Sequence, residues 1–206
     1  MDFLIIWLLK LGIGQGSDII TCSSAGTVSG MNDVGGIAGY SSVNNNLEFC
    51  YSESDISAED FTGGFIGSAD GYTTIENCYA AGDVSGAAYV GGFIGFNGHQ
   101  SNDIINCYSV GEVEIGSYVG GFAGRNLEGS TSACFFDIDT SGRSYGAGIG
   151  VGEYQSGIHG RTTAQMKQEE TFRGYNWNFD DVWDIEEDET YPFLRSNSLS
   201  PLKRRR

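Results

Sequence analysis

The residues of this chain best suited to metal binding or redox chemistry are its five cysteines, because thiolates bind zinc and thiols form disulfides. They recur about every 28 residues, at Cys22, Cys50, Cys78, Cys107 and Cys134. A thiolate metal site needs cysteines that are close in sequence or converge in space, and the chain has only 2 histidines to complete one. We therefore interpret the five as a structural ladder of buried free thiols, which pack like small apolar side chains. One or two disulfides are the main alternative.

A second candidate for chemistry is the run Asp-Ile-Asp-Thr-Ser-Gly at 137–142. Its alternating oxygen side chains match the opening of a calcium loop, in which a bidentate glutamate should stand at the twelfth position. That position is Gly148. Asp137, Asp139 and Ser141 are therefore weak candidates for calcium ligands, and calcium is the only cofactor that the sequence suggests. The competing interpretation is a turn held by its own hydrogen bonds.

Carboxylates are numerous, but the sequence does not arrange them for catalysis. Enzymes that cleave acidic polysaccharides on a β-helix need clustered carboxylates, or calcium and a base, on one exposed face. No acidic pair recurs here beside an arginine or lysine, and no HExxH, GxSxG or Walker motif is present. The acidic residues between positions 180 and 189 are typical of a solvated face. We expect no catalytic residue and no enzyme, with a polysaccharide lyase or hydrolase as the alternative.

The spacing of the cysteines extends to other residue types, so the elements that would position them must repeat as well. Glycine pairs keep the same interval, at Gly35-Gly36, Gly63-Gly64, Gly91-Gly92 and Gly120-Gly121. Aliphatic residues follow each cysteine by six positions, at Val28, Ile56, Val84 and Val113. Short runs rich in Val, Ile, Phe and Tyr alternate with Gly, Asn, Ser and Asp, which favour turns. A repeat of this length indicates stacked units.

The fold expected from this repeat is all-β: a parallel β-solenoid, or β-helix, of about four units with a small α+β cap at the C-terminal side. A unit of about 28 residues can wrap once around a narrow core, and its strands then pair with those of the next unit about 4.8 Å along the axis. Equivalent side chains stack in this arrangement, which explains why each position keeps one residue type. A β-propeller blade needs about 40 residues and four strands, so it fits less well.

The same residues resemble a known family. Val-Gly-Gly-Phe-Ile-Gly-Phe-Asn at 90–97, followed by Ile-Ile-Asn-Cys-Tyr-Ser-Val-Gly-Glu-Val at 104–113, is similar to the GLUG repeat of bacterial and archaeal surface proteins. The stretches 134–142 and 160–167 resemble the segment that often closes such arrays, and the likeness covers roughly residues 18–194. Ser23 and Ser54 depart from the repeat at single positions. The resemblance implies a secreted or cell-surface, adhesin-like solenoid, or an accessory region of a surface metallopeptidase. It implies no catalytic residue.

The composition limits the partners. A net charge of −16 opposes binding to nucleic acid and to an anionic membrane surface. The apolar run at residues 3–9 is far shorter than the roughly 20 residues of a membrane span. Aromatic residues that follow four of the cysteines suggest a binding face, because aromatic side chains recur at interfaces. They are Tyr51, Tyr79, Tyr108 and Phe135. Packing beneath a loop is the competing explanation for them.

We divide the chain into four parts. Residues 1–17 are the remnant of an earlier repeat or an apolar cap, residues 18–142 are the GLUG-type repeats, residues 143–194 are the capping segment, and residues 195–206 are a disordered basic tail. Thr162 and Gln165 form a capping-box pattern before a helix-favouring stretch that ends at Arg173. The function expected is a non-enzymatic structural or adhesive module, extracellular or on the cell surface. Its partners would be neighbouring repeats of a longer array and a surface glycan or matrix protein.

Overall fold

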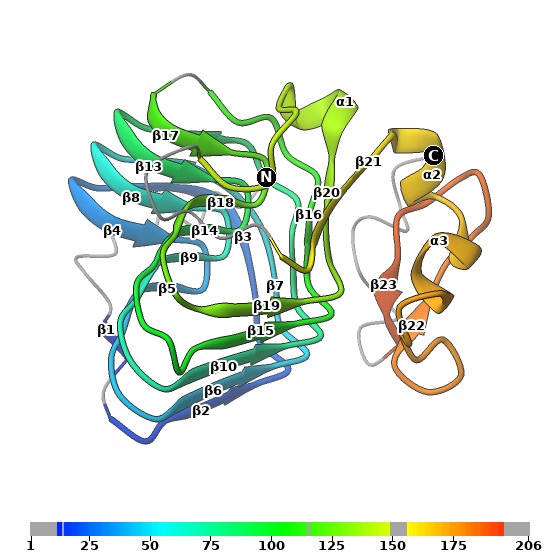
Figure 1. The fold of residues 1–206 in the computed structure, drawn as a ribbon, viewed down its shortest axis with the longest axis horizontal. Coiled ribbons are helices and arrows are strands. Elements are labelled where there is room, and N and C mark those ends of the chain that lie inside the picture. Colours follow the sequence, from blue (N-terminus) through cyan, green and yellow to red (C-terminus); the bar gives the residue numbers. More distant parts are fainter. Residues whose placement is uncertain (1–11, 14, 115, 149–155, 196–206) are drawn as a thin grey trace.

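The computed structural model describes residues 12–13, 15–114, 116–148 and 156–195, which form a parallel β-solenoid of about 5 turns (Figure 1). This confirms the fold class expected from the repeat. The first eleven residues, with the apolar run, and residues 196–206, with the basic tail, lie outside the described part. No helix in the described part is long and apolar enough to cross a membrane.

Four parallel sheets run along the solenoid, and the chain passes through them in the order A, B, C and D in each of the first four turns. Sheet A contains β1 (Gly12–Ile13), β5 (Ala38–Ser41), β9 (Ile66–Ala69), β14 (Ile94–Asn97) and β18 (Ala123–Asn126). Sheet B contains β2 (Asp18–Ile20), β6 (Asn45–Glu48), β10 (Thr73–Glu76), β15 (Asp103–Ile105) and β19 (Ser130–Ser132). Sheet C contains β3 (Ser23–Ser29), β7 (Tyr51–Ser57), β11 (Tyr79–Ala80), β12 (Val84–Ser85), β16 (Tyr108–Ser109), β20 (Cys134–Asp137) and β21 (Ile158–Arg161). Sheet D contains β4 (Asn32–Gly35), β8 (Asp60–Gly63), β13 (Ala88–Gly91) and β17 (Ser117–Gly120).

The glycine pairs form the corner between sheets D and A, where the chain turns too tightly for a side chain. A Cβ on Gly63 would lie 2.1 Å from the carbonyl oxygen of Ile66, and one on Gly64 would lie 2.2 Å from that of Gly92. The same corner places both residues that follow the glycine pair in the core of the solenoid. Phe93 and Ile94 are each 0% exposed, although adjacent residues of a regular strand would face opposite sides.

The core consists of equivalent residues stacked from turn to turn. Phe93 lies between Phe65 and Phe122, with its ring centroid 4.8 Å from each of theirs and the rings nearly parallel. Ile75 pairs in register with Leu47 on one side and Ile104 on the other. These residues and four of the cysteines form one continuous apolar cluster between the sheets.

The C-terminal segment packs along the flank of sheet C. It contains α2 (Thr163–Met166), α3 (Glu169–Arg173), β22 (Trp183–Asp184) and β23 (Phe193–Leu194); we call residues 162–195 the cap. The capping box at Thr162 and Gln165 is present, but the expected helix is broken between α2 and α3, where Gln168 is extended. A cap that follows the last repeat could cover the open end of the solenoid. Instead it lies beside the aromatic residues of several turns of sheet C (Figure 1).

Candidate functional site

The aromatic ladder that the sequence suggested as a binding face is buried beneath the cap. Tyr51 is 8% exposed, and Tyr79, Tyr108 and Phe135 are 0% exposed. Their rings stack along sheet C, with centroids 4.9 Å apart for Tyr51 and Tyr79 and 5.1 Å apart for Tyr79 and Tyr108. The prediction of an open binding face at these residues is therefore wrong. The competing explanation, packing beneath another segment, is closer to the structure, because the cap covers these residues.

The cap is held on this ladder by aromatic packing and by specific hydrogen bonds. The indole nitrogen of Trp177 donates to the carbonyl of Ala133 at 3.0 Å, and that of Trp183 donates to Oδ1 of Asn77 at 3.1 Å. The hydroxyl of Tyr108 donates to the carbonyl of Pro192 at 2.5 Å. Burial raises the pKa of Tyr108, so this hydroxyl keeps its proton. The cap is therefore an integral part of the folded chain.

Asp137, the first of the calcium candidates, accepts hydrogen bonds from the chain itself. Asp137 is 0% exposed, and its Oδ1 accepts the amides of Asp139 and Thr140 at 2.8 and 3.2 Å. Its Oδ2 accepts the hydroxyls of Thr163 and Tyr191, each at 2.7 Å. Four donors occupy the lone pairs of this carboxylate, so it caps α1 (Ile138–Ser141) and ties the last solenoid strand to the cap.

The other two candidates have local partners of the same kind. Ser141 donates its hydroxyl to the carbonyl of Asp137 at 2.5 Å, and Oδ2 of Asp139 accepts the amide of Thr163 at 2.9 Å. These hydrogen bonds show the structural turn that was the competing interpretation, while calcium binding by these three residues stays a prediction. Within the described ranges, no group of three or more His, Cys, Asp and Glu side chains is placed to hold a metal.

The cysteines form a ladder of hydrogen bonds inside the corner between sheets B and C. The amide of Cys50 donates to Sγ of Cys78 at 3.4 Å, and the Cys78 thiol donates to the carbonyl of Glu76 at 3.2 Å. Cys22 is exposed and the other four are buried, all as free thiols. Burial raises the pKa of Cys78 and Cys107 and raises that of Cys134 to about 12. Neutral thiols of this kind are poor nucleophiles and poor metal ligands, so their role is structural.

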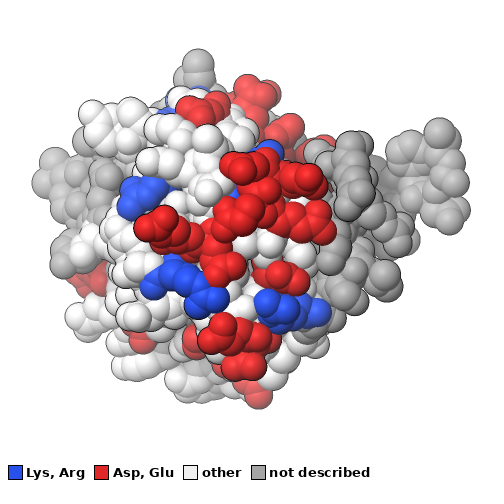
Figure 2. Space-filling model, turned by 90° about the vertical axis from the view of Figure 1, so that its right-hand side faces the viewer, with Lys and Arg blue, Asp and Glu red and all other residues white. Residues whose placement is uncertain are grey.

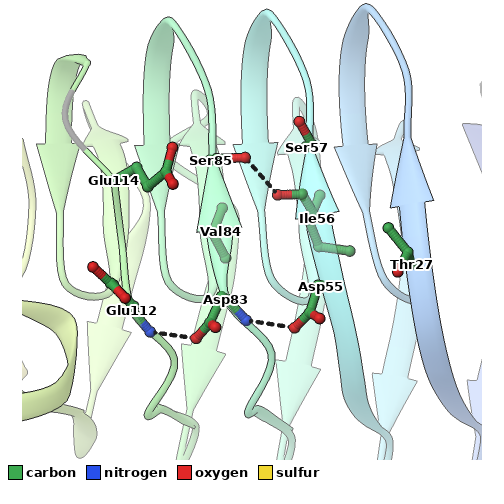
Figure 3. A pocket seen from close by; sticks show the side chains of 9 residues that line it. All are labelled: Thr27, Asp55, Ile56, Ser57, Asp83, Val84, Ser85, Glu112 and Glu114. Carbon is green, nitrogen blue, oxygen red and sulfur yellow. Dashed lines mark hydrogen bonds between the residues drawn. The ribbon is translucent and has the colours of Figure 1, made fainter.

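A line of acidic side chains on the outer side of sheet C is the feature that sequence reasoning missed. It occupies the fifth position after three of the cysteines, at Asp55, Asp83 and Glu112, and Thr27 holds the equivalent position after Cys22. Oδ1 of Asp55 accepts the amide of Asp83 at 3.1 Å, and Oδ1 of Asp83 accepts the amide of Glu112 at 2.8 Å (Figure 3). Asp55 and Asp83 thus each bond to the backbone of the next turn, and Asp83 lies where sheet C is interrupted between β11 and β12. Alignment of the repeats at this position would have found the line.

Two adjoining hollows lie along this acidic line. A groove of about 210 Å³ on the face of sheet C is lined by Asp55, Asp83, Glu112 and Glu114 together with inward-facing aliphatic residues (Figure 3). A larger cleft of about 480 Å³ lies between sheet C and the cap. Asp83 and Glu112 line both, so the two hollows are neighbours. We call the second one the cap cleft.

The cap cleft combines opposite charges that the sequence separates widely. Asp83 and Glu112 come from the solenoid, whereas Lys167 and Glu189 come from the cap. The Lys167 ammonium lies 5.5 Å from the centre of the Tyr191 ring, a cation–π contact that holds it at the cleft wall. Figure 2 shows that acidic side chains dominate this side of the molecule, with a few basic ones among them. No acidic pair has a lysine next to it in the sequence, whereas the folded cap places Lys167 in the same cleft as Asp83 and Glu112.

Comparison with known proteins agrees with the repeat and the fold. Residues 62–85 match the family described as the GLUG motif, and this stretch contains one glycine pair and Cys78, which confirms the resemblance found from the sequence. The crystal structure of a "putative immunoglobulin A1 protease" from Bacteroides ovatus has a TM-score of 0.66 and 24% identity, covering 90% of this chain and 63% of that chain. This likeness shows the fold, and the chain spans about 63% of that protein's length. No curated protein gives a significant match.

Proposed function

We propose that the chain is a non-enzymatic structural and adhesive module of a secreted or cell-surface protein, in which a rigid solenoid presents the groove and the cap cleft to a partner. The observation that carries this proposal is the pair of neighbouring hollows along sheet C, built on turns whose strands pair in register. A scaffold of this kind orders its side chains before the partner arrives, so binding costs little conformational entropy. The GLUG match supports the surface location, because the repeat resembles those of surface proteins.

The partner class follows from the lining of the hollow. Carboxylates and the Lys167 ammonium accept and donate hydrogen bonds, while Val110 and Ala81 supply apolar floor. Such a mixture suits a hydroxyl-rich glycan or a polar protein segment better than an apolar small molecule. A surface glycan or a matrix protein is therefore the partner that we propose, with neighbouring repeats of a longer array as the structural partner of the solenoid ends.

An array experiment tests this proposal. The purified chain would be applied to arrays of glycans and matrix proteins, beside a variant carrying Asp83→Asn and Glu112→Gln. Asparagine keeps an oxygen for the amide of Glu112, so the variant should fold. Glu128→Gln is the matched control, because Glu128 is exposed but does not line either hollow. We expect binding of the wild type and of the control, and a loss of at least about tenfold in the double variant. Binding that survives the double variant would contradict this assignment of the face.

A polysaccharide-active enzyme is the second candidate, and one observation favours it. Asp83, Glu112 and Lys167 line one cleft, which is the combination of carboxylates and a cation that such chemistry uses. Incubation with acidic polysaccharides and measurement of new chain ends would decide between the two functions. Cleavage that Glu112→Gln abolishes and Glu128→Gln preserves would replace the adhesive function with the enzymatic one. No cleavage by the wild type is the expected result.

The Bacteroides ovatus neighbour supports a third arrangement, in which the module accompanies a peptidase. That protein carries a protease name and shares this fold over 90% of the present chain. As an accessory region, the solenoid would place a peptidase near its substrate without taking part in the cleavage. The array experiment addresses this arrangement as well, because a protein substrate would be retained on the same face.

A further inference from the structure

The cap cleft has the size of a ligand site and two walls that come from different parts of the chain. Its volume of about 480 Å³ lies within the range of roughly 300–1,000 Å³ that is typical of ligand pockets. Asp83 and Glu112 belong to the solenoid wall, and Lys167 and Glu189 belong to the cap wall. Buried aromatic packing fixes the cap to sheet C, so both walls are in place before a ligand arrives.

The charged groups of the cleft do not pair with one another. Among the described residues, no ion pair includes Lys167, Glu112 or Glu189. Oδ1 of Asp83 accepts the amide of Glu112, and no described residue donates to its Oδ2. The three carboxylates are on exposed residues, whereas Lys167 is half-buried against the Tyr191 ring. These groups are therefore available to form ion pairs and hydrogen bonds with a ligand.

The balance of charge determines which ligands the cleft attracts. It presents three carboxylates and one ammonium, so it is negative overall. An ammonium group on a ligand is attracted by this excess, and a carboxylate or sulfate group is repelled. The surrounding surface acts in the same direction, because acidic side chains dominate this side of the molecule and the chain has a net charge of −16 (Figure 2). A cationic group is thus the first requirement for the ligand.

Lys167 adds a second requirement, an oxygen close to that cationic group. Its ammonium has three donors and no acceptor, so it needs an oxygen atom of the ligand within the same cleft. A lysine side chain or an alkyl polyamine would satisfy the carboxylates but would leave this ammonium facing a like charge. An amino sugar carries its nitrogen on a carbon next to those that bear hydroxyl groups. The apolar surface of Ala81 and Val110 suits the C–H face of such a ring.

We propose that the cap cleft binds a glycan through an unacetylated amino sugar, with the ammonium toward Asp83 and Glu112 and the hydroxyl oxygens toward Lys167. This assignment rests on the proposed function, because it names the kind of glycan that the module would hold. Acetylation of the amine removes the positive charge and keeps the ring and its hydroxyl groups. The cleft should therefore distinguish the two forms of one glycan, and it should reject acidic glycans.

Isothermal titration calorimetry of the full chain with two matched ligands tests the proposal. The ligands are oligosaccharides of glucosamine and of N-acetylglucosamine with equal length and linkage, in mildly acidic buffer that keeps the amino groups protonated. We expect the amino form to bind at least about fivefold more tightly, because each exposed ion pair contributes modestly and two or three act together. This ratio of affinities should fall as salt is added, since salt screens exposed charges.

Three variants test whether the preference arises in the cleft. Asp83→Asn combined with Glu112→Gln should bring the two affinities to within about twofold of each other, because two of the attracting charges are lost. Lys167→Gln should raise the ratio, since it removes a like charge and keeps a hydrogen-bond donor. Glu128→Gln is the matched control, because Glu128 is exposed and lines neither hollow, and it should leave the ratio unchanged. Thermal melting of each variant establishes that it is folded.

Several outcomes would overturn the proposal. Equal binding of the two oligosaccharides would do so, as would binding of neither. A preference that the double variant leaves intact would show only the general attraction of a cation to an acidic protein. Tighter binding of a short lysine peptide than of the amino oligosaccharide would replace the glycan with a protein segment. The proposed function fails separately: a neutral glycan retained on the array and lost in the double variant would leave it standing and overturn only the amino-sugar assignment.

Discussion

Asp137 is the residue whose replacement tests the structural account most sharply, because a calcium ligand and a hydrogen-bonded junction predict different results. Asp137→Ala removes the acceptor of four hydrogen bonds. The amides of Asp139 and Thr140 belong to exposed residues and can bond to water, while the hydroxyls of Thr163 and Tyr191 are half-buried. At about 1 kcal/mol net for each lost bond, we expect the free energy of unfolding to fall by roughly 4 kcal/mol. Asp137→Asn should cost only about 1–2 kcal/mol, because its amide can donate to the two hydroxyls.

The assay is urea unfolding followed by tryptophan fluorescence in a Trp7→Phe background. The remaining tryptophans, Trp177 and Trp183, are 2% and 0% exposed beneath the cap, so their emission shifts to the red when the cap leaves sheet C. Calcium should not change the melting temperature of the wild type. A calcium-dependent rise that Asp137→Asn abolishes would refute the junction and restore the calcium loop. An equally small loss of unfolding free energy in Asp137→Ala and Asp137→Asn would also contradict the assignment of Asp137 as a hydrogen-bonded junction.

Three further predictions concern the solenoid core. Cys78→Ala should lower the free energy of unfolding in urea by about 2–4 kcal/mol, because it leaves the amide of Cys50 without an acceptor and opens a small cavity. Cys78→Ser should lower it by less. The reverse order would show that the hydrogen bond is unimportant. Phe93→Ala and Ile94→Ala should each lower the stability measured by thermal melting by about 2–5 kcal/mol, since both side chains are fully buried. A negligible loss in either variant would place that side chain outside the core. Burial raises the pKa of the Cys78 thiol, so the thiol of the unfolded chain ionises at a lower pH than that of the folded chain. The stability that Cys78 contributes should be fully present below about pH 8.5 and decline as the pH rises. A urea midpoint that does not change from neutral to alkaline pH would contradict this.

The sequence determined the length and composition of each solenoid turn, because residues that stack in register repeat at a fixed interval along the chain. Equivalent residues of neighbouring turns share one environment, so Phe65, Phe93 and Phe122 recur as a column and the glycine pair recurs at the corner that excludes a side chain. The cysteine interval had the same origin, since the thiols of Cys50 and Cys78 each accept the amide of a neighbouring turn and donate to a carbonyl of their own turn. Comparison of the repeats at the fifth position after the cysteines, one before the aligned aliphatic residues, would have found Asp55, Asp83 and Glu112 as well.

What lies against the outside of the solenoid was decided only by tertiary structure. Tyr79 and Tyr108 alternate outward along sheet C as Phe61 and Tyr89 do at the opposite corner, yet the cap buries the first pair and leaves the second partly exposed. Period and parity describe a residue relative to its own turn, and they carry no information about a segment that returns from far along the chain. The contacts of Trp183 with Asn77 and of Tyr191 with Asp137 span 106 and 54 residues. Such pairings arise from the shape and bonding of surfaces that exist only once the solenoid has formed, and they alone bring Lys167 to the acidic line.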